Sequence, residues 1–316
     1  MTGPIVTLTP NPALDLSTAI DEVVPHVKLR CEAPTFEPGG GGLNVARSVH
    51  SLGGSALALY TSGGPVGDWL GSLLDREGVP RSAFAVGDDS RESIALFDRS
   101  RGDQFRFLMP GPELGEDEWQ RLLDALARLL PNAAEYVVAS GSLPRGVPAD
   151  FYARVAKLAA RHDRKVVLDT SGPPLEAALE EGVFLINPNY REFDALGAWD
   201  ADDTTAREAF AAELVHTGAA AVVAVTLGHR GAMAVSAAGA LRVQPPRVEA
   251  VSGVGAGDGF TAGLTLGLTR GWPLDRALAY AAAAAAGTWM TPGSAVCRRE
   301  DVDRLVDDVA VAAADQ

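Results

Sequence analysis

Short apolar runs alternate along most of the chain with longer segments in which apolar residues recur every three or four positions. The short runs are apolar on both faces, as buried parallel strands are, and they cover residues 5–9, 56–62, 136–140, 165–169, 183–187 and 221–226. The longer segments predict helices at residues 43–52, 68–77, 117–129, 149–162 and 204–217. This alternation predicts an α/β fold in which helices cover both faces of a mostly parallel sheet.

Two segments, residues 12–36 and 87–110, break the alternation, because polar turns join short strands there without a helix between them. In the second segment Phe105 and Phe107 flank Arg106, and period-two alternation gives a strand one apolar and one polar face. A small sheet with an apolar face has to cover something. We therefore expect the two segments to form a lid over the core or against a second chain; an extension of the main sheet is the alternative.

The last part of the chain is glycine-rich after residue 247 and then predicts three helices, at about residues 256–270, 274–290 and 299–313. No apolar stretch has the ~20 residues that a membrane-spanning helix needs, and no leader with a basic start and an apolar centre is visible. A cytoplasmic location is therefore expected. The pattern predicts a single domain, with a core at about residues 1–11, 37–86 and 111–316 and a β lid at about residues 12–36 and 87–110.

The charge balance excludes two classes of partner. The 316 residues include 27 Lys and Arg against 41 Asp and Glu, a formal net charge of −14, whereas a nucleic-acid or anionic-membrane binder needs a basic face.

Cys31 and Cys297 lie far apart and form no metal motif or disulfide framework. No lysine follows a glycine, so the Walker A loop of P-loop kinases is absent, and no glycine triplet fits the dinucleotide-binding fingerprint.

The strongest chemical signal is the segment Ser-Gly-Val-Gly-Ala-Gly-Asp at residues 252–258, which leads into a predicted helix. Small residues ahead of a helix N-terminus let successive backbone N–H groups point at one anion, and the helix dipole adds positive charge there. Asp258 in the first turn is either a residue that stabilises the helix dipole or a base beside a phosphate cradle.

Two further segments place polar residues where a ligand could bind. Residues 37–47 contain four consecutive glycines before a predicted helix, which lets the backbone approach a ligand closely and brings Asn44 beside it; a hinge for the lid is a compatible alternative. After the predicted strand at 183–187, Asn189 and Glu192 stand three residues apart and could together hold one hydrated Mg²⁺. The alternative is a short helix that the same two residues cap.

Together these segments resemble the ribokinase-like carbohydrate kinase superfamily in its phosphofructokinase-B branch. The N-terminal glycine-rich signature of the family matches at residues 39–47 and the C-terminal one at residues 254–258. The resemblance runs essentially end to end and includes residues 7–15 and 140–144. It implies a ribokinase-like three-layer α/β/α sandwich with a small β-sheet lid, and a kinase that uses ATP and Mg²⁺; a monovalent cation is a second candidate cofactor.

By this resemblance Asp258 is the general base that takes the proton from the attacking sugar hydroxyl. The backbone N–H groups of Gly255, Ala256 and Gly257 then stabilise charge on the transferring phosphoryl group. The family positions that hold sugar hydroxyls match Asp15, Gly39, Gly40 and Asn44.

The resemblance also implies a phosphate site for the sugar and a nucleotide site. Candidates for the sugar's own phosphate are Lys28, Arg30, Arg91, Arg106 and Ser140. In the resembled enzymes the lid sheets of two subunits pack together and the lysine can reach the neighbouring site, so a homodimer through the lid is expected. Nucleotide contacts are expected from Asn187, Asn189, Thr226, Gly228 and Gly231, and a Mg²⁺ contact through water from Glu192. Relatives often carry lysine at the position of Asn187 and threonine at that of Gly253, so one charge contact to ATP is lost.

Within the branch, residues 28–31 and 36–42 look most like the minor bacterial 6-phosphofructokinases. The glycine run lacks the lysine that 1-phosphofructokinases and tagatose-6-phosphate kinases usually carry there. The implied reaction is ATP-dependent phosphorylation of the C1 hydroxyl of fructose 6-phosphate to fructose 1,6-bisphosphate, as in glycolysis. A 1-phosphofructokinase or a tagatose-6-phosphate kinase is the alternative, and a nucleoside kinase or a non-catalytic sugar-phosphate sensor is less favoured. The expected partners are sugar phosphate and ATP, without nucleic acid or membrane.

Overall fold

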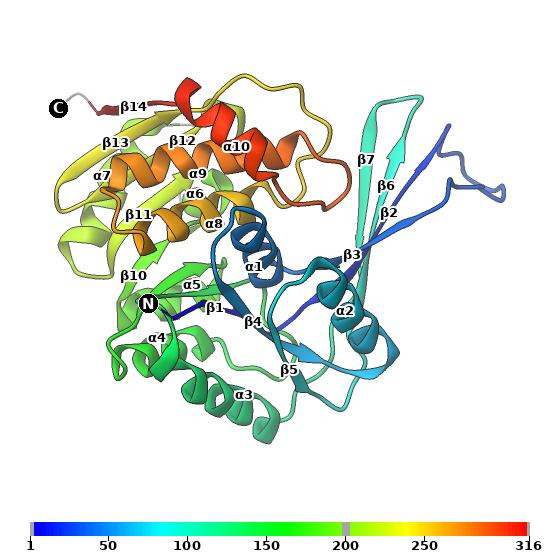
Figure 1. Ribbon diagram of the computed structural model, residues 1–316, viewed down its shortest axis with the longest axis horizontal. Helices are drawn as coiled ribbons and strands as arrows, with labels where there is room; N and C mark the ends of the chain where they lie inside the picture. The colour runs from blue at the N-terminus through cyan, green and yellow to red at the C-terminus, as the bar shows by residue number, and fades with distance from the viewer. Residues whose placement is uncertain (1–2, 198–202, 315–316) are drawn as a thin grey trace.

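Residues 3–197 and 203–314 are described by the computed structural model, and their strands form two separate sheets (Figure 1). The strands of the larger sheet are β1 (Ile5–Thr9), β4 (Ala56–Ser62), β5 (Arg81–Ala85), β8 (Tyr136–Ser140), β9 (Lys165–Asp169), β10 (Val183–Ile186), β11 (Ala220–Thr226), β12 (Ala232–Ser236), β13 (Gly239–Gln244) and β14 (Ala310–Ala313). Their order in space is β14-β13-β12-β11-β10-β9-β8-β1-β4-β5. Neighbours from β5 to β11 run parallel, and β12, β13 and β14 continue the sheet as antiparallel strands.

Helices cover both faces of this sheet and bury a separate apolar cluster on each. One face carries α1 (Gly41–Ser51), α2 (Gly64–Glu77), α8 (Ala256–Thr269), α9 (Leu274–Trp289) and α10 (Arg299–Leu305). The other carries α3 (Glu116–Leu129), α4 (Phe151–Ala160), α5 (Pro173–Glu181), α6 (Tyr190–Gly197) and α7 (Thr204–His216). Successive strand residues point to opposite faces, so Ile5 belongs to the first cluster and Val6 to the second. The predicted three-layer α/β/α architecture is confirmed.

The smaller sheet comes from the two segments that break the alternation of strands and helices. Its strands are β2 (Ala13–Ile20), β3 (Thr35–Gly39), β6 (Arg91–Asp98) and β7 (Asp103–Leu108), in the order β3-β2-β6-β7. It projects from one side of the core in Figure 1. The alternative of an extension of the main sheet is therefore wrong. The register pairs Asp15 with Glu37 on one side and with Ser93 on the other.

The helix predicted at about residues 299–313 is wrong in its second half. The helix α10 ends at Leu305, and Ala310–Ala313 form β14, which pairs with β13 at the edge of the large sheet. Alanine and valine occur in helices and strands alike, so the short apolar tail has no clear periodicity of its own. The tail forms a strand because the outer edge of β13 would otherwise leave backbone N–H and C=O groups without partners.

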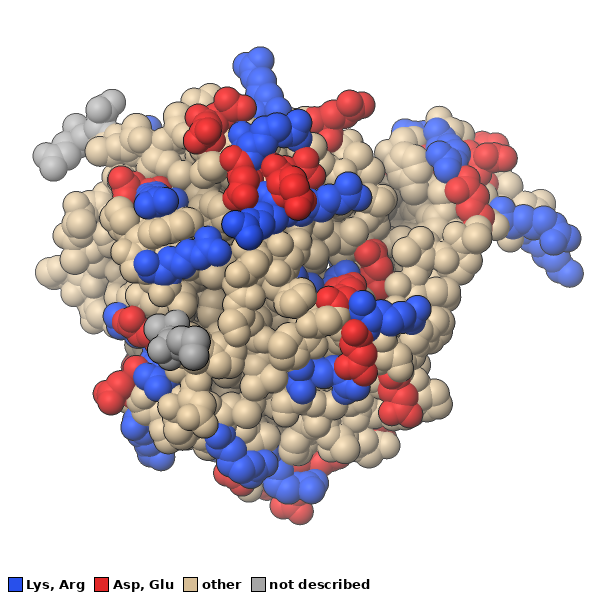
Figure 2. Space-filling model, viewed as in Figure 1, with Lys and Arg blue, Asp and Glu red and all other residues tan. Residues whose placement is uncertain are grey.

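Charged side chains of both signs lie close together on the molecular surface. On the face shown in Figure 2, blue and red groups are interspersed over the helices, and the tip of the small sheet carries both. The net charge of −14 therefore does not appear on this face as one continuous acidic field. Among the residues that the structure describes, no helix is long and apolar enough to cross a bilayer.

Candidate active site

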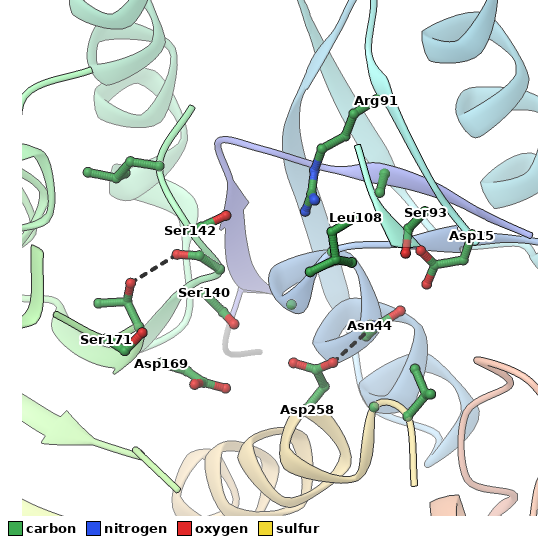
Figure 3. Close-up of a pocket in the computed structure, with 18 of the residues that line it drawn as sticks. Asp15, Asn44, Arg91, Ser93, Leu108, Ser140, Ser142, Asp169, Ser171 and Asp258 are labelled. Atoms are coloured by element: carbon green, nitrogen blue, oxygen red, sulfur yellow. Dashed lines mark hydrogen bonds between the residues drawn. The ribbon is translucent and has the colours of Figure 1, made fainter. Parts of the chain in front are cut away.

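A cavity of about 600 Å³ lies where the carboxyl ends of the central strands face the small sheet. Open α/β sheets bind ligands at this edge. In Figure 3 Asp169 and Asp258 lie on one side of the cavity, and Asp15, Arg91 and Ser93 on the side of the small sheet. The predicted site residues that line it are Asp15, Gly40, Asn44, Arg91, Arg106, Ser140, Glu192, Gly255 and Asp258. The structure thus brings together residues from all three motifs.

Asp258 lies in the first turn of α8, directly after the glycine-rich loop. Gly255 caps this helix with a φ of 78°, a left-handed conformation that glycine adopts without strain. The Oδ2 atom of Asp258 accepts a hydrogen bond of 2.9 Å from Nδ2 of Asn44. Burial raises the pKa of Asp258 to about 7, although the bond from Asn44 opposes the shift. A carboxylate with a pKa near neutrality is suited to take up a proton and to release it again.

The glycine run lets α1 begin close to this carboxylate. A Cβ atom at Gly41 would lie 2.1 Å from Oγ of Ser140 and 3.2 Å from Oδ1 of Asp258. Gly40, the residue before the helix, has a φ of 105°. The run is therefore needed for close approach, and it places the N-terminus of α1 at the same cavity as that of α8.

Asp15 lies on β2 beneath the glycine run. A Cβ atom at Gly39 would lie 2.3 Å from the Asp15 carboxylate, so no larger residue fits there without displacing it. Burial raises the pKa of Asp15, and the positive charges of Arg106 and Arg91 oppose the rise. The small sheet thus presents one carboxylate and two guanidinium groups to the cavity, as sugar hydroxyls and a phosphate would require.

Two basic residues predicted for the phosphate site lie elsewhere. Lys28 and Arg30 are exposed on the connection between β2 and β3 and do not line the cavity of their own chain. Arg91 points into the cavity in Figure 3, and its Nη2 donates a bond of 3.2 Å to the carbonyl oxygen of Asn11. Arg106 of β7 lines the same wall.

The predicted nucleotide residues are spread over the next strand ends. The backbones of Asn189 and Thr226 form a parallel bridge, while Gly228 and Gly231, at φ values of 63° and 93°, form the turn that follows. Asn187 is buried, does not line the cavity, and donates from Nδ2 to Oγ1 of Thr261 at 2.7 Å. The missing lysine at this position is thus replaced by an internal contact.

Asn189 and Glu192 form the helix cap that was the alternative to a metal site. Oδ1 of Asn189 accepts from the backbone N–H of Glu192 at 3.1 Å, and Oε2 of Glu192 accepts from that of Asn189 at 3.0 Å. Glu192 nevertheless lines the cavity. The cap fixes where this carboxylate stands, so the two interpretations are compatible.

Asp169, at the end of β9, was missed by the sequence analysis. Its pKa is raised well above the ordinary value by burial and by the charges of Asp258 and Glu192. Its position as the last residue of a predicted strand was the available signal, because strand ends of a parallel sheet share one edge. Asp169 and Glu192 both line the cavity, and two carboxylates suit a Mg²⁺ ion that keeps several waters. Among the described residues there is no cluster of three or more groups for a dehydrated metal.

Comparisons with known proteins find relatives along nearly the whole chain. The model of the pfkB family of carbohydrate kinases matches residues 11–301. The ATP-dependent 6-phosphofructokinase isozyme 2 of Mycobacterium tuberculosis is 43% identical over 303 residues, which are 96% of this chain and 89% of the relative. The protein of the same name from Escherichia coli K12 is 37% identical over 302 residues, 95% of this chain and 97% of the relative.

Solved structures give the same result. The phosphofructokinase-2 of Escherichia coli in complex with fructose-6-phosphate superposes with a TM-score of 0.90 at 35% identity, covering 97% of this chain and 99% of that chain. Other structures of the same protein, at 36% identity, contain potassium or represent its tetrameric inhibited form. With a family match over most of its length and relatives above one-third identity, this chain belongs to the pfkB family of carbohydrate kinases.

Proposed function

We propose that this chain is a cytoplasmic 6-phosphofructokinase, which transfers the γ-phosphoryl group of ATP to the C1 hydroxyl of fructose 6-phosphate and releases fructose 1,6-bisphosphate and ADP. The observation that carries the proposal is the position of Asp258. A half-buried carboxylate stands in the first turn of α8, in a cavity whose opposite wall carries Arg91 and Arg106. A proton acceptor, an anion site and a phosphate site thus lie in one space. The relatives' names supply the choice of sugar.

In the proposed reaction the C1 hydroxyl gives its proton to Asp258 as its oxygen attacks the γ-phosphorus. The bond between that phosphorus and the bridging oxygen to the β-phosphate breaks, and the electron pair leaves with ADP. Backbone N–H groups of Gly255, Ala256 and Gly257 at the start of α8 face the charge that spreads over the transferring group. Positioning and electrostatics supply most of the rate in such transfers.

Asp15 and Asn44 hold the sugar hydroxyls, with Gly39 and Gly40 shaping the floor, and Arg91, Arg106 and Ser140 bind the sugar's phosphate. On the nucleotide side, Asn189, Thr226, Gly228 and Gly231 contact ATP. Glu192 and Asp169 would hold Mg²⁺ through water, and the bound ion would neutralise phosphate charge on ATP. One structure of the Escherichia coli relative contains potassium, and we expect turnover here to depend on a monovalent cation as well.

We also propose that two copies pair through the small sheet. The sheet and its loops expose six large apolar side chains: Val27, Leu29, Phe97, Phe107, Leu108 and Met109. Exposed apolar side chains concentrated on one small element indicate an interface. Lys28 and Arg30, which do not line the cavity of their own chain, lie on a connection that would then meet the partner. Lys28 would reach the neighbouring site.

The test is a substrate panel with the purified chain. kcat/KM is measured with fructose 6-phosphate, fructose 1-phosphate, tagatose 6-phosphate and adenosine at saturating ATP and Mg²⁺. We expect the first to be highest. A clear preference for either of the next two sugars would overturn the substrate assignment but keep the class of reaction. Preference for adenosine would indicate a nucleoside kinase, and the absence of ADP release with every compound would indicate a sensor.

A further inference from the structure

Arg47 of α1 is a charged residue that has no part in the proposed reaction, although only 3% of its surface is exposed. Its Nε and Nη2 donate to the two carboxylate oxygens of Glu77 at 2.7 and 2.8 Å. Its Nη1 lies within 3.1 Å of three further acceptors, the carbonyl oxygens of Pro38 and Ser294 and the Oδ1 atom of Asn44. Such a buried and fully bonded guanidinium holds its partners in fixed positions.

The contact with Asn44 has a chemical consequence. An amide side chain has an accepting and a donating end, and the two can exchange by a rotation of the group. A guanidinium can only donate, so the end of Asn44 that faces Arg47 has to be the oxygen. The nitrogen then faces Asp258 and donates to its Oδ2 atom at 2.9 Å. Arg47 therefore makes Asn44 a donor, and not an acceptor, toward Asp258.

We infer that Arg47 is a positioning residue, which acts through the amide of Asn44 to keep Asp258 oriented and ionised for proton transfer. The inference rests on the proposed function, since it takes Asp258 as the base. With Oδ2 occupied by Asn44, the other oxygen is left for the substrate. That oxygen, Oδ1, is the one that faces the N-terminus of α1 at Gly41.

Arg47 is not a simple ion-pair partner of Asp258, because other carboxylates balance its charge. Glu77 of α2 binds it through two bonds, and Oε1 of Glu37 on β3 lies 3.7 Å from its Nη2. Glu37 is itself held by the backbone N–H of Ser294 at 2.8 Å and by its hydroxyl at 3.0 Å. The guanidinium is thus anchored by α2, by β3 and by the carbonyl oxygen of Ser294, and its remaining contact goes to Asn44.

The charge state of Asp258 depends on groups from several elements. Asn44 and Arg47 of α1 and Arg106 of β7 favour its ionised form, whereas burial and Asp15 of β2 oppose it. Asp169 of β9 stands near Asp258 and Glu192 of α6, whose negative charges raise its pKa. Loss of Arg47 removes one positive charge and frees the amide to turn its oxygen toward the carboxylate. Both effects favour protonated Asp258.

The experiment compares Arg47→Met, Arg47→Lys, Asn44→Ala and the two double variants with the wild-type enzyme. kcat/KM is measured against pH at saturating ATP, with whichever substrate the wild type phosphorylates fastest. In Arg47→Met, kcat/KM should fall about tenfold at pH 7 and the acid limb should move upward by about one pH unit, with recovery at higher pH. Arg47→Lys keeps a charged donor beside Asn44 and should stay closer to the wild type. In the Asn44→Ala background the same substitutions of Arg47 should lower kcat/KM less than about threefold, because the amide through which Arg47 acts is absent.

Arg81→Met is the matched control. Arg81 of β5 forms two hydrogen bonds, of 2.7 and 2.8 Å, with Asp75 of α2, the helix that also carries Glu77. Arg81 does not line the cavity. Its loss should leave the pH profile of the enzyme unchanged. A shift of the profile in this variant equal to that of Arg47→Met would mean that general loosening of α2 is responsible, and would overturn the inference.

Two more outcomes would overturn it. The first is a wild-type pH profile in Arg47→Met or, where that variant does not fold, an acid limb in Arg47→Lys that moves by a full pH unit although lysine keeps the charge and the donor. The second is an equal loss with and without Asn44, which would show that Arg47 does not act through the amide. Neither depends on the sugar, since each variant is compared with the wild type on the same compound. An error in the proposed substrate is seen in the panel alone.

Discussion

Asn44 and Asp258 are joined by a hydrogen bond of 2.9 Å, although 214 positions separate them in the sequence. Asn44 comes from α1, the helix that follows β3, and Asp258 from α8, the helix that follows the second glycine-rich loop. The bond joins the part of the cavity that we assign to the sugar with the part that we assign to phosphoryl transfer. A change in the position of α1 or α8 should therefore change the orientation of the Asp258 carboxylate.

Asp258→Asn should lower kcat by about 10²–10⁴-fold, because the amide cannot accept the hydroxyl proton. Binding of fructose 6-phosphate, measured by calorimetry without ATP, should stay within a few-fold of the wild type. Normal turnover in this variant would contradict the assignment of the base.

Activity should rise with pH through the titration of this carboxyl. Burial raises the pKa of Asp258 to about 7, and only the ionised form can act as base. kcat/KM should therefore fall about tenfold per pH unit below that value and level off above it. The acid limb should disappear in the residual activity of Asp258→Asn. A flat wild-type profile between pH 5.5 and 8 would speak against a base with this pKa.

The raised pKa also has a thermodynamic consequence. The folded protein keeps Asp258 protonated up to about pH 7, whereas the unfolded chain releases this proton near the ordinary pKa of 3.8. The free energy of unfolding therefore decreases as the pH rises from the lower value to the higher one. Asp258→Asn should accordingly raise Tm at pH 8 more than at pH 5. Equal changes of Tm at both values, measured by scanning calorimetry, would show that the carboxyl titrates normally.

Arg106→Met should raise KM for fructose 6-phosphate by about 10–100-fold, because charged hydrogen bonds to phosphate contribute on the order of 1.5–3 kcal/mol. KM for ATP should change little, since Arg106 stands on the small sheet. Arg101→Met is a control in the preceding turn that does not line the cavity. If KM for the sugar phosphate is the same in both variants, the phosphate is bound elsewhere.

Gly39→Ala should impair the sugar side of the site. The new methyl group would stand 2.3 Å from the carboxylate of Asp15, which has to move. We expect kcat/KM for fructose 6-phosphate to fall at least tenfold. Gly87→Ala, on the exposed connection between β5 and β6, is the control, because a Cβ atom there meets only the Glu118 carboxylate, at 3.6 Å. Its activity should be that of the wild type.

The double variant Phe97→Asp with Phe107→Asp should be monomeric in light scattering, where the wild type is expected as a dimer. The register pairs Phe97 with Gln104 and Phe107 with Ile94, so the two rings lie on opposite faces of the sheet. The single variants therefore tell which face forms the interface. Ala238→Asp, on an exposed turn of the core, should leave the mass unchanged. A monomeric wild type would contradict the proposed dimer.

Much of the fold could be predicted from the sequence because its central strands are buried on both faces. The runs at β1, β4, β8 and β9 have the predicted bounds, since apolar residues end there at polar or glycine-rich turns. The hairpin β12–β13 was not predicted. The eleven residues of its two strands include three alanines and a glycine, which show little preference for a strand.

The site was predictable where a residue stands in a glycine-rich loop or at a strand end. Asn44 and Asp258 follow such loops, and both line the cavity. Arg47 carried no such signal, because a charged residue within a helix usually faces solvent, and only its burial sets it apart. The burial of Asn187 likewise depends on contacts with α8 that no local pattern contains.

The order of the sheet also bears on synthesis of the chain. From β8 to β11 each new parallel strand adds next to the one before it, whereas α8 returns to pack against α1 near the start of the sheet. A nascent chain that ends before Gly255 therefore contains the small sheet, Asp15 and Asn44 but no proton acceptor. Such a precursor lacks the base and the helix N-terminus that the proposed phosphoryl transfer requires. In the proposed reaction, phosphoryl transfer would begin only once the last fifth of the protein has left the ribosome and packed against α1.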